Sequence, residues 1–351
     1  MRMKNMNFCL NFQIINKKTI YTLKKIAVVI LNWNGVQLLE QFLPSVVKYS
    51  SEADIYVADN ASTDNSISFV EANFPIVKIV KNTGNYGFAK GYNDALQHID
   101  TELYALVNSD IEVTENWLQP IIATFEKEPE TAIIQPKILD FKNKEYFEYA
   151  GAAGGFIDKY GFPYCRGRIF DTIEKDNGQY NDACEISWAS GACFFIRSKV
   201  YHELQGFDAD FFAHQEEIDL CWRAKNKNHQ IKYNPNSVVY HVGGATLQQG
   251  NPKKTFLNFR NSLLMLVKNL PKENFYSTLF IRLSLDGLAG IHFILQGKFA
   301  HCWAILKAHF AFYALFSKTY KKRAHFQSKR YYNTKNIVIN YYINNGKVFV
   351  K

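Results

Sequence analysis

Short apolar segments rich in β-branched residues alternate with segments of helical periodicity over the first third of the chain. The apolar segments are, in order, Ile26–Leu31, Asp54–Ala58, Val77–Val80 and Tyr104–Val107. The segments between them, Val36–Tyr49, Ser62–Asn73 and Phe88–Ile99, carry apolar side chains at helical spacing. This alternation predicts an α/β protein with an open, mostly parallel central sheet flanked by helices.

Polar or acidic side chains directly follow three of the predicted strands. They are Asn32 and Asn34 after the first strand, Asp59 and Asn60 after the second, and Asn108 and Asp110 after the fourth. Ligands of parallel sheets bind beyond the carboxyl ends of the strands, so these side chains predict a functional edge. Asn and Asp are also ordinary turn residues, which explains each group separately but not the coincidence of all three.

A second candidate site lies in the middle of the chain. Trp188–Arg197 is predicted to be a strand that is entered through a turn of small residues. A helix is predicted over residues 211–228, and its first turn contains Glu216, Glu217 and Asp219, where the helix dipole favours anions. The alternative is a solvated helix start in which Asp219 simply pairs with a basic residue one turn later.

The composition is that of a globular protein. Of 351 residues, 47% are hydrophobic, which is enough apolar surface to exclude collagen-like, low-complexity and mainly disordered chains. No apolar run reaches about 18 uncharged residues, which argues against a conventional membrane-spanning helix. The six cysteines are scattered without metal-finger spacing, so we expect buried thiols in a reducing cytosol.

Charge divides the chain into two unequal parts. Residues 1–252 carry 24 Lys and Arg against 30 Asp and Glu, whereas residues 253–351 carry 17 against 2, so the net charges are −6 and +15. A basic, aromatic-rich C-terminal region suits an anionic partner, either a membrane surface or a nucleic acid. No zinc-finger, helix-turn-helix or RNA-recognition pattern accompanies it, so no nucleic-acid partner is expected.

The basic region contains two long apolar segments. Charged or His side chains interrupt both Leu279–Leu295 and Ala300–Phe316, which favours amphipathic helices lying in a membrane interface over helices that span it. The basic and aromatic residues of 318–332 fit the anionic cytoplasmic leaflet of a cell membrane. The alternative is a helical subdomain that packs on the rest of the protein and exposes a solvated basic face.

Six segments occur in the order found in a known family. They are IAVVILNWNG (26–35), VADNASTDNS (57–66), NTGNYGFAKGYNDAL (82–96), LVNSD (106–110), SGACFFIRSKVYHELQGFDADFFAHQEEIDLCWRAK (190–225) and VVYHVGGAT (238–246). Together they resemble the family 2 inverting glycosyltransferases of the GT-A fold, particularly the bacterial rhamnosyltransferase-like branch. The resemblance covers most of residues 25–248.

The resemblance implies an activity and a domain organisation. A sugar would pass from a nucleotide-diphospho-sugar, a UDP- or dTDP-sugar with dTDP-rhamnose as one candidate, to a saccharide or polyprenyl-linked saccharide in cell-surface polysaccharide synthesis. Residues 24–250 would form the catalytic domain, with a nucleotide-binding half (24–115) and an acceptor half (116–250). Residues 1–23 would be a poorly ordered extension, and 251–351 a basic, amphipathic helical region. The protein would be cytoplasmic and peripheral at the inner face of the cell membrane.

The resemblance also implies a nucleotide and metal site. Asp59 matches the carboxylate that accepts the N3–H of a uracil or thymine ring. The nucleotide-binding residues are expected to be Leu31, Asn32, Trp33, Asp59, Asn60 and Asn108. Asn108-Ser109-Asp110 matches the family's metal-binding motif, in which Asp110 would be a direct ligand of Mg²⁺ or Mn²⁺. His241 lies where some relatives supply a further ligand, and imidazole suits Mn²⁺ better than Mg²⁺.

The catalytic base is expected among the acids of the predicted helix start. The family has Glu-Asp followed by an apolar residue and Asp, whereas this chain has Glu216-Glu217-Ile218-Asp219, which places Glu217 at the base position. Glu216 is the alternate if the register slips by one residue. An inverting transfer needs one carboxylate to deprotonate the acceptor hydroxyl. Acceptor and sugar contacts are expected from Ser190, Gly191, Ala192 and Asp219.

Two other classes of function stay open at this point. A different sugar-nucleotide enzyme is disfavoured, because Asn32-Trp33-Asn34-Gly35 is not a glycine-rich phosphate loop and no GxGxxG follows the first strand. A non-catalytic membrane-associated scaffold on the same fold is disfavoured by the presence of Asp110, Glu216 and Glu217.

Overall fold

The computed structural model describes residues 24–243, 250–324 and 326–349. Within these residues, nine strands form one mixed sheet, with the order β11-β13-β6-β12-β4-β1-β2-β3 and with β5 paired to β13. The strands are β1 (Ile26–Asn32), β2 (Ala53–Asp59), β3 (Lys78–Lys81), β4 (Leu103–Asn108), β5 (Ile111–Val113), β6 (Thr131–Asp140), β11 (Cys184–Glu185), β12 (Cys193–Arg197) and β13 (Gln230–His241). The predicted α/β class is confirmed; the predicted N-terminal extension 1–23 lies outside the described residues.

The N-terminal half of the sheet is parallel, as the alternating pattern predicts. β1 pairs in parallel with both β2 and β4, and β2 pairs in parallel with β3. The helices between them are α1 (Val36–Tyr49), α2 (Ser66–Asn73) and α3 (Gly87–Leu96). β1 is almost wholly buried, which is why it reads as a continuous apolar run rather than an alternating one.

The C-terminal half of the sheet mixes directions. β12 runs antiparallel to its neighbours β4 and β6, while the long strands β6 and β13 are parallel to each other. α4 (Gln119–Lys127) and α5 (Ser198–Glu203) flank this half. A small second sheet has the order β10-β9-β8-β7, with β7 (Gly155–Ile157), β8 (Pro163–Cys165), β9 (Arg168–Ile169) and β10 (Thr172–Ile173).

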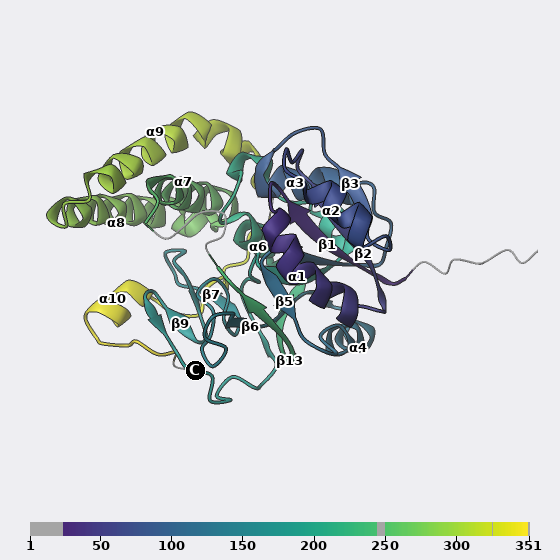
Figure 1. Cartoon of the computed structure of the whole chain (residues 1–351). Helices are drawn as coiled ribbons and strands as arrows, with labels where there is room; N and C mark the ends of the chain where they lie inside the picture. Colours follow the sequence, from purple (N-terminus) through teal and green to yellow (C-terminus); the bar gives the residue numbers. More distant parts are fainter. Residues whose placement is uncertain (1–23, 244–249, 325, 350–351) are drawn as a thin grey trace, which may run out of the picture.

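The C-terminal region packs against the sheet domain through helices. α7 (Pro252–Asn269) lies against α6 (Glu216–Asn226), and α9 (Phe299–Lys321) packs along α7. α8 (Phe275–Leu295) and α9 form an antiparallel hairpin that extends away from the large sheet (Figure 1). The last segment returns to the body and ends in α10 (Ile337–Tyr342), beside the small sheet.

Three predicted helices have wrong boundaries, and one of them, expected over 88–99, spans Gly87–Leu96. The helix expected over 62–73 begins only at Ser66, because the side chains of Ser62 and Asp64 bond to the loop after β1 instead. The helix expected over 211–228 spans only 216–226 and follows a short 3₁₀ turn, Ala209–Phe211. Phe212, His214 and Gln215 all have positive φ, and this left-handed backbone cannot continue a right-handed helix.

Candidate active site

The strand ends singled out by the sequence meet at one edge of the large sheet. Parallel pairing sets Asn32 opposite Asp59, and sets Leu31 opposite Asn108. The backbone N–H of Asn108 donates to the carbonyl of Ala192, at 2.9 Å. The expected nucleotide residues and the small-residue segment before β12 therefore share this edge.

Asp59 is the centre of a buried polar cluster at this edge. Its Oδ1 accepts hydrogen bonds from the Ser62 hydroxyl, at 2.5 Å, and from the Asn32 amide, at 3.2 Å. Its Oδ2 accepts one from the Ser62 backbone N–H, at 3.0 Å. The Asn34 side chain accepts from the backbone of Thr63. Asn32 and Asn34 therefore hold the loops that follow β1 and β2 together.

The other expected nucleotide residues have different surroundings. Trp33 is 52% exposed beside the cluster, so its ring is open to a ligand. Asn60 is buried; its amide donates to the carbonyl of Gly87 and its oxygen accepts from Asn82. Asn60 therefore ties the end of β2 to the start of α3.

Asp110 and His241 lie together, and Glu148 joins them. Nε2 of His241 is 3.1 Å from Oδ1 of Asp110, and Nδ1 is 3.3 Å from Oε1 of Glu148. All three side chains are buried. Glu148 also contacts the loop that follows it, because Oε2 of Glu148 accepts a hydrogen bond from the backbone N–H of Ala150, at 2.6 Å. The glycine-rich sequence around Glu148 gave no signal that would have identified it.

The two carboxylates favour positive charge between them. Burial lowers the pKa of His241, but the charge of Glu148 and the hydrogen bond with Asp110 more than offset it and raise this pKa to about 10. A divalent cation at this position would meet hard carboxylate oxygen and imidazole nitrogen, which are ligands that suit Mn²⁺ and, less well, Mg²⁺. Across the described ranges, no group of three or more His, Cys, Asp or Glu side chains is arranged to coordinate a metal ion.

Glu217 lies beside Gly191 and is partly accessible. A Cβ added to Gly191 would lie 3.7 Å from Cδ of Glu217, so the carboxyl group is in contact range of the small-residue segment. Its Oε2 has no hydrogen-bond partner among the described residues. Burial raises the pKa of Glu217 to about 7, against the opposing effect of nearby backbone N–H groups. A carboxylate with this pKa is suited to accept a proton near neutrality.

Glu216 differs from Glu217 in accessibility. Glu216 is only 4% exposed, whereas Glu217 is half-buried. Burial, together with the charge of Glu217, raises the pKa of Glu216 well above its usual range. Of the two, Glu217 has the better access to an acceptor.

Three of the expected acceptor contacts do not face an open site. Ser190 and Ala192 are buried, and the Ser190 hydroxyl accepts a hydrogen bond from the backbone N–H of Ala192. Asp219 is fully buried, and its carboxylate binds Lys268, Arg223 and Asn269. The alternative interpretation of the sequence is right about the pairing of Asp219 with Arg223, but wrong about a solvated helix start, because Glu216 and Asp219 are buried.

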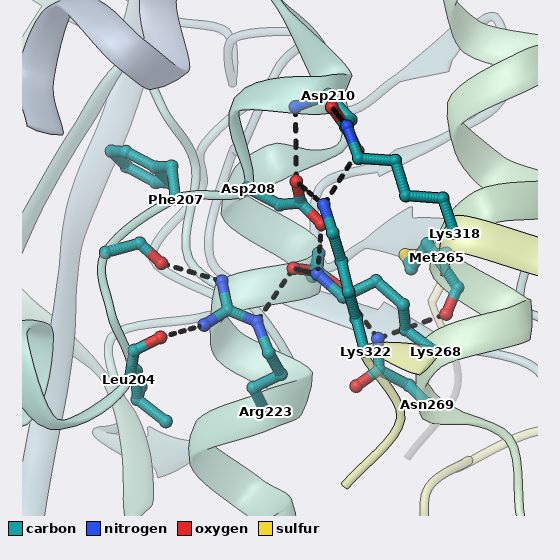
Figure 2. A network of polar contacts seen from close by, with 12 residues as sticks. Leu204, Phe207, Asp208, Asp210, Arg223, Met265, Lys268, Asn269, Lys318 and Lys322 are labelled. Carbon is teal, nitrogen blue, oxygen red and sulfur yellow. Dashed lines mark hydrogen bonds and ion pairs between the residues drawn. The ribbon is translucent and has the colours of Figure 1, made fainter. Parts of the chain in front are cut away.

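Asp219 belongs to a network that joins α6 to α7 and α9. Lys268 lies between Asp219 and Asp208, at 2.7 and 2.8 Å, and Lys322 of the segment after α9 contacts Asp208 at 2.6 Å (Figure 2). Burial opposes ionisation of Asp219, but Lys268 and Arg223 lower its pKa. Asp219, the last acid of Glu216-Glu217-Ile218-Asp219, thus holds α6 against α7.

The loop before Glu216 is held by residues that the sequence did not identify. Asn261 of α7 is fully buried and its amide donates to the carbonyls of Phe211, Ala213 and His214, at 3.0, 2.9 and 2.7 Å. From the other side, the N–H of Phe88 at the start of α3 donates to the carbonyl of Phe212. α7 therefore helps to position the start of α6.

Comparison with family models identifies the class of the protein. Residues 27–205, just over half of the chain, match the family model described as glycosyl transferase family 2. The chain belongs to glycosyl transferase family 2. The predicted enzyme class is confirmed, and this chain is a glycosyltransferase.

Curated relatives of this transferase are distant. It is 21% identical over 249 residues to the low-salt glycan biosynthesis hexosyltransferase Agl10 of Haloferax volcanii, covering 69% of this chain and 75% of the relative. It is 20% identical over 218 residues to an N-acetylglucosaminyl-diphospho-decaprenol L-rhamnosyltransferase of Mycobacterium tuberculosis, and the match covers 58% of this chain and 71% of the relative.

Solved structures confirm the GT-A fold of the transferase. It superposes on GalNAc-T7 with UDP, GalNAc and Mn²⁺ at a TM-score of 0.56 and 17% identity, covering 73% of this chain and 50% of that one. It superposes on S. aureus TarS in complex with UDP-GlcNAc at 0.55 and 15% identity, covering 85% and 84%. At these identities the likeness concerns the fold alone.

Proposed function

We propose that this transferase moves a sugar, with inversion, from a UDP- or dTDP-sugar to a saccharide or polyprenyl-linked saccharide in cell-surface polysaccharide synthesis. The observation that carries the proposal is the carboxyl group of Glu217: the residue is partly exposed, its Oε2 has no hydrogen-bond partner among the described residues, and it lies beside Gly191 in the segment that meets the strand ends at Asn108. The name of the mycobacterial relative supports dTDP-rhamnose as the first donor to test.

Glu217 is the proposed catalytic base. As a carboxylate, it accepts the proton of the acceptor hydroxyl while that oxygen attacks the anomeric carbon and the diphosphate leaves from the opposite face. One base is enough and no covalent intermediate forms. Glu216 remains the alternate base, but its burial makes an acceptor harder to reach.

The proposed nucleotide site is the cluster around Asp59. Oδ2 of Asp59 accepts only one hydrogen bond within the described residues, which leaves a lone pair for the N3–H of uracil or thymine. Trp33 is exposed where it can lie against the base. Leu31, Asn32, Asn60 and Asn108 shape the floor of the site at the strand ends.

Asp110 and His241 are the proposed ligands of a divalent cation. When bound, Mn²⁺ or Mg²⁺ would neutralise the charge that develops on the leaving diphosphate. A cation that also binds phosphate oxygens needs few protein ligands, which agrees with the two adjacent donors. Support comes from GalNAc-T7, whose structure contains UDP and Mn²⁺.

The proposed location is the inner face of the cell membrane, with the transferase as a peripheral protein. A polyprenyl-linked acceptor carries its sugar at the membrane surface. We also propose that residues 24–250 carry out the chemistry and that residues 251–351 support both the active site and this location.

Calorimetric titration with UDP, dTDP and GDP, each with and without Mn²⁺, tests the proposal. We expect Mn²⁺-dependent binding of UDP or dTDP, and the same titration of Asp110→Asn should show little effect of Mn²⁺. Binding of GDP alone would contradict the role given to Asp59. The absence of binding by a folded sample would contradict the proposed donor site.

A further inference from the structure

Both helices of the α8–α9 hairpin expose large apolar side chains. On α8 the exposed side chains recur about once per turn, as do those on α9, so each helix presents one stripe. The stripes contain Tyr276, Phe280, Leu288, Ile291 and Leu295 on α8, and Phe299, Trp303, Leu306, Phe310 and Tyr313 on α9. Phe280, Trp303 and Phe310 are 71%, 58% and 71% exposed. An exposed apolar patch of this extent marks an interaction surface.

The opposite face of the hairpin is fixed to the protein. Arg282 is buried and donates to the carbonyl of Tyr160 and to the hydroxyl of Ser262. Asp286, also buried, contacts His309 of α9 at 3.2 Å. Phe312 is fully buried on the side of α9 that packs on α7. The hairpin is therefore held against the rest of the protein by one face and exposes large apolar side chains elsewhere.

The positive charge of the C-terminal region favours an anionic partner. Residues 287–351 contain eleven Lys and Arg and no Asp or Glu. The single carboxylate within α8 and α9, that of Asp286, points inward and is buried. Lys298 at the tip of the hairpin and Lys307 on α9 are exposed. The exposed side chains of α8 and α9 are thus aromatic, aliphatic or positively charged. This combination binds anionic lipid headgroups and the boundary of the acyl chains.

We propose that the exposed face of α8 and α9 is a docking surface for an anionic lipid bilayer. Its aromatic and aliphatic side chains enter the interface, and Lys298 and Lys307 contact the headgroups. Both segments, Lys272–Leu295 and Phe299–Lys321, are long and apolar enough to cross a membrane. Crossing would remove Arg282 from Tyr160 and Ser262, its partners outside the hairpin, so the helices lie in the interface.

This surface deepens the membrane location given under the proposed function, but its test does not depend on catalysis. Vesicle binding can fail while sugar transfer is observed, and transfer can fail while vesicles are bound. The two proposals are therefore distinguishable.

Vesicle co-sedimentation of the full chain is the test. The vesicles are phosphatidylcholine alone or phosphatidylcholine mixed with phosphatidylglycerol. We expect the wild type to bind the anionic vesicles. The triple variant with Phe280→Ser, Trp303→Ser and Phe310→Ser should bind them at least tenfold more weakly. The double variant with Lys298→Glu and Lys307→Glu should also bind more weakly, and its binding should depend less on salt. The matched controls, Ile76→Ser and Lys127→Glu, change exposed residues near α2 and α4 and should bind like the wild type.

Three results would overturn the proposal. The first is wild-type protein that stays in the supernatant with anionic vesicles, or a triple variant that binds as well as the wild type. The second is a dimer by light scattering that the triple variant converts to a monomer, because the surface would then serve a second copy. The third is resistance to alkaline carbonate extraction from cell membranes, because the helices would then span the bilayer.

Discussion

Glu217 is the residue on which the proposed chemistry depends, and its environment sets its protonation. Burial at the start of α6 disfavours the charged form and raises its pKa to about 7, and the carboxyl group lies beside Gly191. The carboxylate form, which is the active base, is therefore present above this pKa and lost below it.

The pH dependence of transfer follows from that pKa. We expect kcat/KM to fall about tenfold per pH unit below about pH 7 and to level off above it, since the protonated acid cannot accept a proton. Initial rates measured across buffers of constant ionic strength check this. A profile that stays flat down to about pH 5, near the unperturbed pKa of a glutamate, would contradict the assignment.

Glu148 is expected to act on metal binding through His241. It lies 3.3 Å from Nδ1 of His241, while Nε2 faces Asp110. Partners of this kind orient a ligating imidazole, and their loss typically costs about 10–100-fold in metal affinity. Titration of Mn²⁺ in the presence of UDP or dTDP should show that loss in Glu148→Gln.

Glu145→Gln is the matched control for Glu148, because Glu145 is an exposed acid of the same segment that pairs only with Lys175 among the described residues. Its Mn²⁺ affinity should equal that of the wild type. Equal affinities in both variants would show that Glu148 does not support the metal site.

At the scale of elements, the C-terminal region helps to build the active site. The loop before α6 has three residues with positive φ, Phe212, His214 and Gln215, a strained arrangement that needs support from its surroundings. Asn261 provides that support through three hydrogen bonds to loop carbonyls. α7 therefore acts as a clamp on the loop that leads to Glu217.

Replacing Asn261 with Ala should lower kcat by about tenfold or more, because a misplaced base loses proton-transfer efficiency, while binding of the nucleotide diphosphate stays near the wild-type value. Steady-state kinetics and calorimetry together check this split. Asn258→Ala, a change at a partly exposed position about one turn earlier on α7, is the control. Parallel losses of kcat and nucleotide binding would indicate general unfolding rather than a misplaced base.

The sequence was informative about elements and less so about their ends. The strands and the polar residues that follow them could be predicted, because burial in a parallel sheet imposes continuous apolar runs and a shared edge. The start of α6 could not, because Gln215 is not a residue type that signals positive φ. The sequence also did not predict that Asp219 is buried, or what Glu148 and Asn261 do. These features depend on contacts between distant segments: Lys268, for example, contacts Asp219 from 49 positions away.

For the whole molecule, buried ion pairs join the sheet domain to the C-terminal helices. Lys268 is buried between Asp208 and Asp219, as Figure 2 shows for Lys268 and Asp208. Opposing the effect of burial, Lys268 lowers the pKa of both aspartates. The stability from these pairs is therefore present above the unfolded-state pKa of about 4 and is lost as the pH falls through the lower folded-state values.

Lys268→Met should cost about 3 kcal/mol of unfolding free energy at neutral pH, since it leaves buried carboxylates without their main cation. The variant should also lose less stability on acidification than the wild type. Urea denaturation at several pH values checks both statements. Lys318→Met removes an exposed partner of Asp210 and should cost at most about 1 kcal/mol; equal effects of the two variants would contradict the account.

The measurement closest to the central claim compares Glu217→Gln with the wild type for sugar transfer and for binding of UDP and dTDP with Mn²⁺. We predict a loss of transfer of about 10²–10⁴-fold, nucleotide binding near the wild-type value, and a thermal unfolding temperature no lower than that of the wild type. Transfer at the wild-type rate in this variant would contradict the claim that Glu217 is the base, and would make Glu216 the next candidate.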